Sequence, residues 1–183
     1  MTASELEQAL YGYIRPAYPE IDIKITVDDN DILNIYFTEQ KFKELYPKQR
    51  YHYLIHKIPD DFIELHLKNT LWFELAPGEN LHDLDYHDDE TIESIKAPIM
   101  SKLTHKIGFV TQLDKVFTHE GAMCFGDFRY SKKILADLGY ASNEEQFDIF
   151  HVLMNEGGYC DCEILFNVFH ESEYSKIYWS TRK

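Results

Sequence analysis

The sequence predicts an α+β protein, in which a helix-hairpin-helix-strand unit precedes a mostly helical C-terminal unit with a short terminal strand. Three observations predict this class. The first part of the chain changes between helical and two-residue periodicity, residues 92–117 carry apolar side chains three or four apart, and the segment between these parts is acidic. We therefore expect an α+β domain at 1–78, an acidic linker at 79–93 and a C-terminal domain at 94–183.

The N-terminal unit begins with the pattern of a helix, because Ser4 and Glu7 have the spacing of a capping box. Two runs of alternating apolar residues, 21–27 and 32–37, follow around a cluster of turn formers and predict a β-hairpin. The elements expected after the hairpin are a helix at 49–58 and a strand at 71–75.

This order of elements, with Phe42 and Arg50 leading into the second helix and Leu75 to Glu79 after the last strand, resembles the BolA-like fold, a relative of type II KH domains. The resemblance implies an α+β fold. Leu71 to Phe73 stand where that family has its iron-ligating histidine, so the resemblance does not imply iron-sulfur or glutaredoxin binding here.

The C-terminal unit has the pattern of helices. The apolar stripe over 92–117 fits one long helix, with Pro98 in its first turn or at a kink. Ser131 is expected to cap a helix that ends at the glycine after Leu138, and residues 142–145 form a second capping box. The last residues, through 176–179, predict a strand.

Composition narrows the classes of partner. The chain has 18 basic and 32 acidic residues and a formal charge of -14, which disfavours nucleic acid and fits a protein partner for an acidic surface. Residues 1–10 lack the pattern of a signal peptide, and no stretch approaches the roughly 20 apolar residues of a membrane span. We therefore expect a cytoplasmic protein that binds neither nucleic acid nor membrane.

Side chains that can bind metal or react are most concentrated in residues 157–168, where a Gly-Gly pair precedes Cys160, Asp161, Cys162 and Glu163. In a reducing compartment the three cysteines of the chain should be thiols or metal ligands. A strand would turn both thiols of the motif to one side, whereas a helix start would place the acids at the positive end of the dipole. The sequence leaves these two geometries open.

Cys124 is the expected third partner of Cys160 and Cys162. It lies just before two predicted helices, and Cys160 follows the second, so a helix-turn-helix arrangement can bring the two ends of this segment together. Three thiolates and one histidine would form a tetrahedral zinc site, although Cys-x-Cys lacks the usual knuckle spacing. The candidate histidines are His119, taken as the tentative ligand, His151 and His170. We favour structural thiols packed as small hydrophobic groups over this metal site, and a reactive thiolate beside His119 or His151 is the third alternative.

The acidic segment offers a second group of ligand types. Its spacing does not fit a calcium loop, since Ser94 stands where the twelfth-position glutamate belongs. We favour a solvated linker over a metal site. The residues concerned are His82, Asp83, Asp85 and His87.

The run from Cys124 to Ser131, the helix with Leu135 and Leu138, and residues 157–168 together resemble the bacterial family named domain of unknown function 2695, over about 118–170. The resemblance implies no activity, because the family has none assigned. It places these residues in the motif: Cys124, Asp127, Arg129, Cys160, Asp161, Cys162, Glu163 and Asn167.

Two further expectations concern this motif. Arg129 would form a buried ion pair with Asp127 and Glu163 that holds the two halves together. For function we expect a non-catalytic binding or adaptor protein with an acidic surface. The alternatives are a zinc-binding module through the three cysteines, and a thiol enzyme or redox sensor; no phosphate-binding loop or Gly-x-Ser-x-Gly elbow supports another enzyme.

Overall fold

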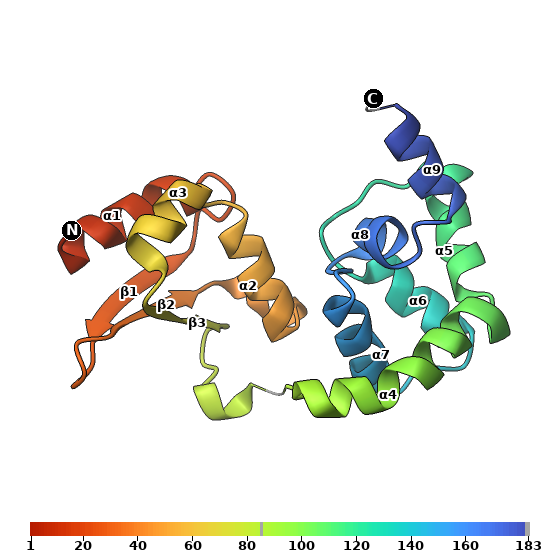
Figure 1. The fold of residues 1–183 in the computed structure, drawn as a ribbon, viewed down its shortest axis with the longest axis horizontal. Coiled ribbons are helices and arrows are strands. Elements are labelled where there is room, and N and C mark those ends of the chain that lie inside the picture. Colours follow the sequence, from red (N-terminus) through yellow and green to blue (C-terminus); the bar gives the residue numbers. More distant parts are fainter. Residues whose placement is uncertain (85, 182–183) are drawn as a thin grey trace. The chain divides into compact units, whose positions relative to one another are not determined.

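The computed structural model describes residues 1–84 and 86–181, and it confirms the α+β class. The chain divides into two compact units, Met1–Asp85 and Tyr86–Lys183, which are described separately below. Unit 1 contains the sheet, and the regular elements of unit 2 in its described residues are all helices (Figure 1).

Unit 1 has the helix-hairpin-helix-strand order that the sequence predicts. Its strands form a three-stranded sheet in the order β1-β2-β3, in which β1 and β2 are antiparallel and β2 and β3 are parallel. The helices lie on one side of this sheet (Figure 1). The elements are α1 (Ala3–Ile14), β1 (Asp22–Val27), β2 (Leu33–Thr38), η1 (Gln40–Glu44), α2 (Pro47–Ile55), α3 (Asp60–Phe62), η2 (Ile63–Leu67) and β3 (Thr70–Leu75).

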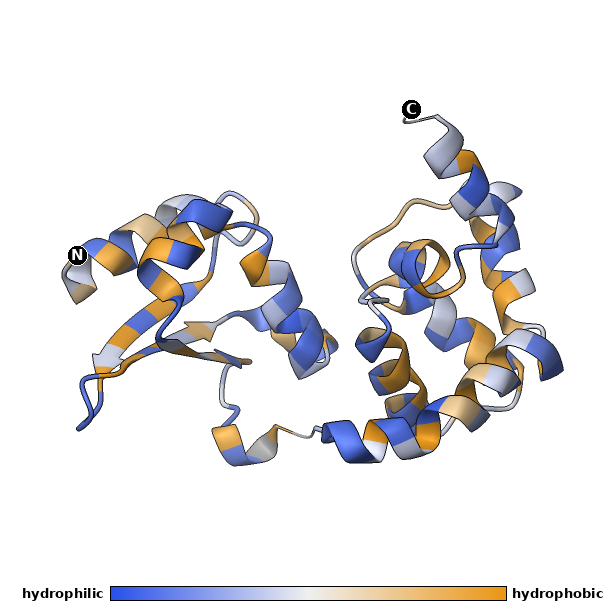
Figure 2. Cartoon of the chain, in the orientation of Figure 1, coloured by the Kyte–Doolittle hydropathy of each residue, from blue (hydrophilic) through white to orange (hydrophobic). Residues whose placement is uncertain are grey.

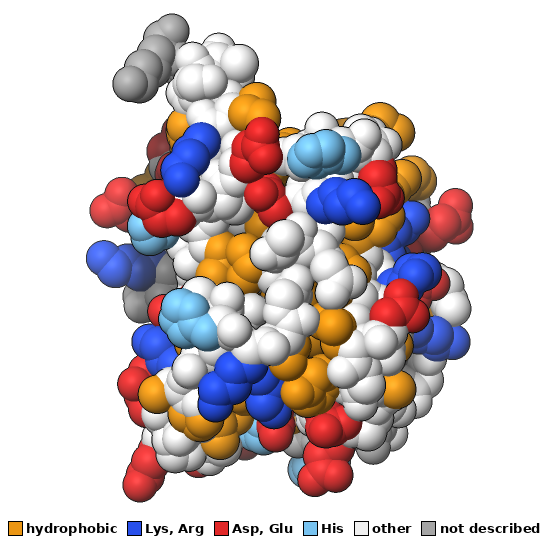
Figure 3. Space-filling view, turned by 90° about the vertical axis from the view of Figure 1, so that its right-hand side faces the viewer, with side chains coloured by type: hydrophobic (Ala, Val, Ile, Leu, Met, Phe, Trp, Pro, Cys, Tyr) orange, Lys and Arg blue, Asp and Glu red, His pale blue; other side chains and the backbone are white. Residues whose placement is uncertain are grey.

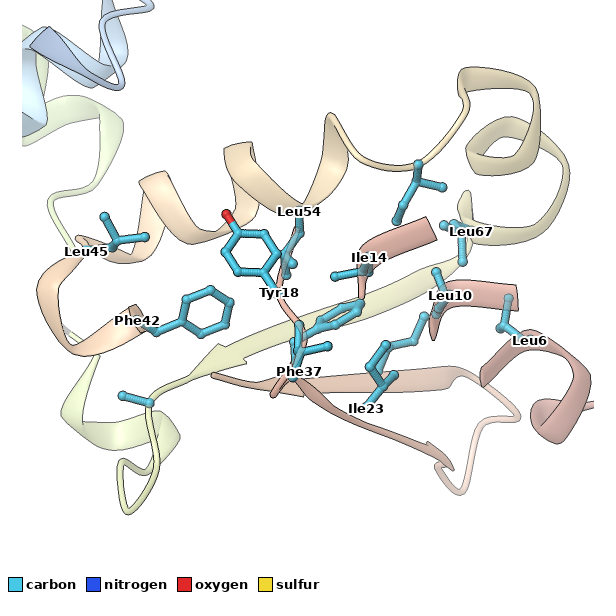
Figure 4. Close-up of a cluster of buried hydrophobic side chains, with 14 residues drawn as sticks. Leu6, Leu10, Ile14, Tyr18, Ile23, Phe37, Phe42, Leu45, Leu54 and Leu67 are labelled. Carbon is cyan, nitrogen blue, oxygen red and sulfur yellow. The ribbon is translucent and has the colours of Figure 1, made fainter. Parts of the chain in front are cut away.

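The core of unit 1 forms between the helices and one face of the sheet. Ile23 and Phe37 are cross-strand partners, and they face Leu10 and Ile14 of α1 and Leu54 of α2 (Figure 4). Because side chains alternate along a strand, the odd-numbered apolar residues of β1 and β2 share this buried face. Figure 2 marks hydrophobic residues along the ribbons of these helices and strands.

A buried arginine closes the end of unit 1. Arg50 donates through Nε to the Leu45 carbonyl at 3.1 Å and through Nη1 to the Glu74 carbonyl at 2.9 Å. Its guanidinium also pairs with both carboxylate oxygens of Glu79, and Glu79 accepts the Ala76 amide at 2.8 Å. Glu79, at the start of the acidic segment, is therefore tied to the N-terminal fold.

The N-cap of the first helix lies two residues earlier than expected. Thr2, not Ser4, forms the capping box: the Glu5 amide donates to Thr2 Oγ1 at 3.2 Å, and the Thr2 amide donates to Glu5 Oε2 at 2.7 Å. Thr2 to Glu5 and Ser4 to Glu7 have the same spacing, so the pattern alone could not choose between them.

Unit 2 is built from helices that pack in pairs, with α4 against α7 and α5 against both α6 and α9. In the described residues no helix is long and apolar enough to cross a membrane. Acidic, basic and apolar side chains are mixed on the face shown in Figure 3. The elements are α4 (Asp89–Ser101), η4 (Lys102–Lys106), α5 (Phe109–Thr118), α6 (Arg129–Asp137), α7 (Asn143–Asn155), α8 (Asp161–Glu163), η5 (Ile164–Val168) and α9 (Glu173–Ser180).

The apolar stripe at the start of unit 2 is divided between two helices instead of one. Gly108 adopts a positive φ of 69°, which interrupts the helix after η4 and precedes α5. Pro98 lies inside α4, which continues past it to Ser101. Ser142 caps α7 as expected by accepting the Glu145 amide, and Gly139 has the left-handed conformation expected after α6.

The predicted terminal strand is wrong, because residues 173–180 form α9. Ser172 caps this helix by accepting the Ser175 amide at 3.2 Å. Tyr174 and Tyr178, four residues apart, place their rings 5.2 and 4.1 Å from the ring of Phe166. These two tyrosines are thus on the packing face of a short helix.

The buried carboxyl group of Glu74 should make the stability of unit 1 depend on pH. Glu74 is buried in β3, and burial raises the pKa of its carboxyl from 4.5 to about 7 despite Arg50. The folded state therefore holds this proton more tightly than the unfolded chain. The resulting stability is fully present below pH 4.5 and is lost as the pH rises through about 7, by about 3 kcal/mol.

Glu74→Gln should remove this loss and make unit 1 more stable than the wild type at about pH 8. Urea unfolding followed by Trp72 fluorescence, in a Trp179→Phe background, measures it across the pH range. Glu20→Gln, at an exposed position, is the control and should keep the wild-type slope. An unchanged slope in Glu74→Gln would contradict the assignment.

Candidate metal centre

The Cys-Asp-Cys segment is a helix start, which settles the choice between strand and helix. Cys160 is the N-cap residue with extended backbone, and Asp161 to Glu163 form α8, which runs on into η5. Glu163 reaches back from the first turn and accepts the amide of Tyr159, the residue before the N-cap, at 3.0 Å. The acidic residues of the motif therefore stabilise a helix terminus.

The two glycines before the motif have different functions. Gly157 has φ of 88°, a conformation that favours glycine, and its carbonyl accepts Asn167 Nδ2 at 2.8 Å. Gly158 instead allows close packing, since an added Cβ would lie 3.0 Å from side-chain atoms of Ile164 and Val168. The Gly-Gly pair and Asn167 of the motif thus fold the chain back onto η5.

Asp161 joins the two halves of the motif. Its side chain is 2% exposed, and its two oxygens accept the amides of Tyr130 and Ser131 at 3.0 and 2.9 Å. These amides belong to the first turn of α6, so Asp161 caps that helix from a distant part of the sequence. Its own amide donates to the Asp127 carbonyl at 3.0 Å.

This arrangement corrects the expectation that Ser131 caps the helix. Ser131 lies inside α6 and is fully buried, and its amide is the donor to Asp161. Burial raises the pKa of the Asp161 carboxyl to about 6, although the hydrogen bonds from Ser131 and Tyr130 oppose the shift.

Arg129 pairs with Asp127 as expected, but the prediction that this pair is buried is wrong. The Arg129 side chain is 49% exposed, and its Nε donates to Asp127 Oδ1 at 2.9 Å. Its guanidinium carbon lies 3.9 Å from the centroid of the Phe125 ring. Such an exposed pair contributes little stability, so the connection between the halves comes from Asp161.

The structure brings together the three cysteines that the sequence singled out. The Sγ atoms are separated by 3.4 Å between Cys124 and Cys160, 3.3 Å between Cys160 and Cys162, and 2.8 Å between Cys162 and Cys124. Cys160 is buried, Cys162 is partly exposed and Cys124 is exposed. Three sulfur ligands in this arrangement could hold a metal ion.

Backbone amides reinforce negative charge at Cys124. Hydrogen bonds with the thiols of Cys160 and Cys162 lower the pKa of the Cys124 thiol, and the backbone amides of Gly126 and Cys162 act in the same direction against burial. The hydrogen bonds with Cys124 and Cys162 raise the pKa of the Cys160 thiol. The set is therefore suited to hold one sulfur as a thiolate.

Gly126 is a residue that sequence reasoning missed. It lies two positions after Cys124 and has φ of 73°, in the left-handed region that favours glycine. The signal in the sequence was the Cys-x-Gly spacing, which lets the amide of the turn approach the sulfur of the cysteine before it.

The histidines considered as fourth ligands lie elsewhere. His119 Nδ1 is 2.7 Å from Thr118 Oγ1, His151 is buried in α7 with Nδ1 2.9 Å from the Phe147 carbonyl, and His170 is exposed with Nε2 3.9 Å from Glu171. Among the described residues, the cluster of ligand atoms around the sulfurs consists of the three cysteines.

The acidic segment makes a separate contact. His87 Nε2 lies 2.7 Å from Asp148 Oδ1 on α7, so this histidine is paired within unit 2. His82 is exposed in the short helix η3 (Leu81–Asp83). Asp85 and the side chain of Asp83 lie outside the described residues.

The fold and the site together define unit 2 as a helical unit that carries a cluster of three cysteines. The model of one protein family, described as "Protein of unknown function (DUF2695)", matches residues 110–167. The match runs from α5 to η5 and includes all three cysteines, so it supports the resemblance stated for the C-terminal part. No curated protein and no solved structure matches the chain, and nothing supports the BolA-like resemblance of unit 1.

Asp161→Ala should destabilise unit 2 by about 2 to 4 kcal/mol, because it leaves two amides at the buried start of α6 without their acceptor. Asp161→Asn keeps one acceptor oxygen and should lose less. Thermal unfolding by circular dichroism measures the loss, and Lys133→Ala, which breaks an exposed pair with Asp137 on the same helix, should change stability by less than about 0.5 kcal/mol. Equal stability of Asp161→Ala and the wild type would contradict the capping role.

Gly158→Ala should cost about 1 to 3 kcal/mol, because the added methyl group would press on Ile164 and Val168. Gly12→Ala is the matched control. Its site in α1 has no atom within 4 Å of an added Cβ, so that variant should gain about 0.5 to 1 kcal/mol from helix propensity. Denaturant unfolding of both variants gives the comparison, and a neutral Gly158→Ala would exclude the close packing.

Proposed function

We propose that unit 2 is a metal-binding module in which Cys124, Cys160 and Cys162 bind one zinc ion. The observation that carries this proposal is the convergence of three sulfur atoms within 3.4 Å of one another, from segments 36 residues apart in the sequence. Thiols packed only as small hydrophobic groups have no reason to converge in this way, least of all when one of them is exposed.

Zinc is the ion that suits these ligands best. It is a borderline-soft ion without redox chemistry, and it accepts thiolates in tetrahedral sites. A tetrahedral ion with Zn–S bonds of about 2.3 Å separates its sulfur ligands by about 3.8 Å. The sulfur triangle therefore has to open by about 0.5 to 1 Å, which small rotations of the cysteine side chains provide.

The metal would act on the fold at the place where Asp161 already joins two segments. Cys160 and Cys162 flank Asp161, and Cys124 lies in the loop before α6. An ion shared by these residues would fix the loop to the helix start of the motif. The proposed ion would therefore support the fold of unit 2, and the binding of a protein partner at an acidic surface stays a prediction from the sequence.

Purified protein should contain about one zinc ion per chain, measured by elemental analysis after preparation without chelators. Cys160→Ser and Cys124→Ser should lose most of this zinc, and a strong chelator should lower the melting temperature of the wild type but not of these variants. His119→Ala is the matched control, since its ring lies outside the sulfur cluster, and it should keep the zinc.

Failure of the wild type to bind zinc, both as purified and on titration of the reduced protein, would refute the proposed function. Retention of full zinc by Cys160→Ser would also refute it, because that residue contributes the most buried of the three sulfurs.

A further inference from the structure

We propose that the fourth coordination position of the ion is open to solution and takes a neutral nitrogen or sulfur donor, such as an imidazole or a thioether. This inference rests on the proposed zinc centre and assigns its external ligand. It makes the centre a place where another molecule can bind directly to the metal.

The number of ligands from the chain is the first argument. Three sulfurs satisfy three positions of an ion that prefers four. His119 and His151 each make a hydrogen bond away from the sulfurs, at 2.7 and 2.9 Å, and His170 lies near Glu171. No other ligand atom from the described residues joins the sulfur cluster. A zinc site with three protein ligands keeps its last position for water or for an external molecule.

The exposure of the sulfurs shows from which side that molecule arrives. Cys160 is buried, whereas Cys124 is exposed, so the open position lies on the side of Cys124. The two neighbours of Cys124 in the chain are exposed apolar side chains: Met123 is 70% exposed and Phe125 is 44% exposed. Exposed apolar side chains therefore flank Cys124 in the chain.

The charge of the site selects a neutral donor. A divalent ion with three thiolates has a net charge of about -1. The Glu163 carboxylate adds negative potential at Cys160 and Cys162. Arg129, the basic residue of the motif, is already hydrogen-bonded to Asp127. An anion at the fourth position would meet this negative charge without compensation, whereas a neutral lone-pair donor would displace water with no added charge.

Cobalt(II) substitution of the full-length protein tests the inference. Cobalt replaces zinc in such sites, and its visible absorption bands report the number and type of its ligands. Imidazole is the neutral probe and azide is the anionic probe. We expect imidazole to change the visible bands in a saturable way and to bind at least about tenfold more tightly than azide, which corresponds to about 1.4 kcal/mol.

Two variants keep the outcome decisive. His119→Ala and His170→Ala should show the wild-type cobalt spectrum and the same response to imidazole. A tetrahedral spectrum that ignores imidazole, or one that changes in either variant, would overturn the open position and reveal a fourth ligand from the chain. Tighter binding of azide than of imidazole would overturn the choice of a neutral donor. Absence of cobalt and zinc binding altogether would instead refute the metal centre.

Discussion

The carboxylate of Asp161 is the interaction on which unit 2 depends. The first amides of a helix have no partner within it, and in α6 two of them are satisfied by a residue 31 and 30 positions further along the chain. A buried carboxylate carries a desolvation cost that only such hydrogen bonds offset. The start of α6 and the start of α8 therefore have to form together, and the two halves of the motif are a single structural unit.

The sulfur cluster follows from this constraint. Asp161 fixes the backbone between Cys160 and Cys162, and the turn at Gly126 fixes Cys124 beside them. The chain thereby collects three thiols near the protein surface at little further cost in conformational entropy. Preorganisation of this kind is what a metal ion needs from its ligands, and the proposed zinc binding would be coupled to the stability of the fold.

Much of this could be predicted from the sequence where local chemistry decided the structure. The hairpin, the cap at Ser142, the stop at Gly139 and the grouping of the three cysteines all follow from short-range patterns or from the order of elements. The errors arose where several local solutions were equivalent. Thr2 and Ser4 offer the same capping box, and the aromatic residues of α9 fit a strand or a helix until Phe166 is known to face them.

The long-range role of Asp161 could not be predicted, because nothing in its spacing indicates which helix it caps. Arg129 illustrates the converse: its charge suggested a buried pair, yet the side chain is half exposed and stacks on Phe125. In both cases the tertiary position of a residue decided its role, and the residue type alone did not.

Zinc K-edge X-ray absorption of the protein as purified tests the central claim most directly, because it counts the sulfur ligands of the bound ion. The account predicts three sulfur neighbours at about 2.3 Å and one lighter ligand at a shorter distance. A shell without sulfur, or with four sulfur atoms, would contradict a single ion held by Cys124, Cys160 and Cys162.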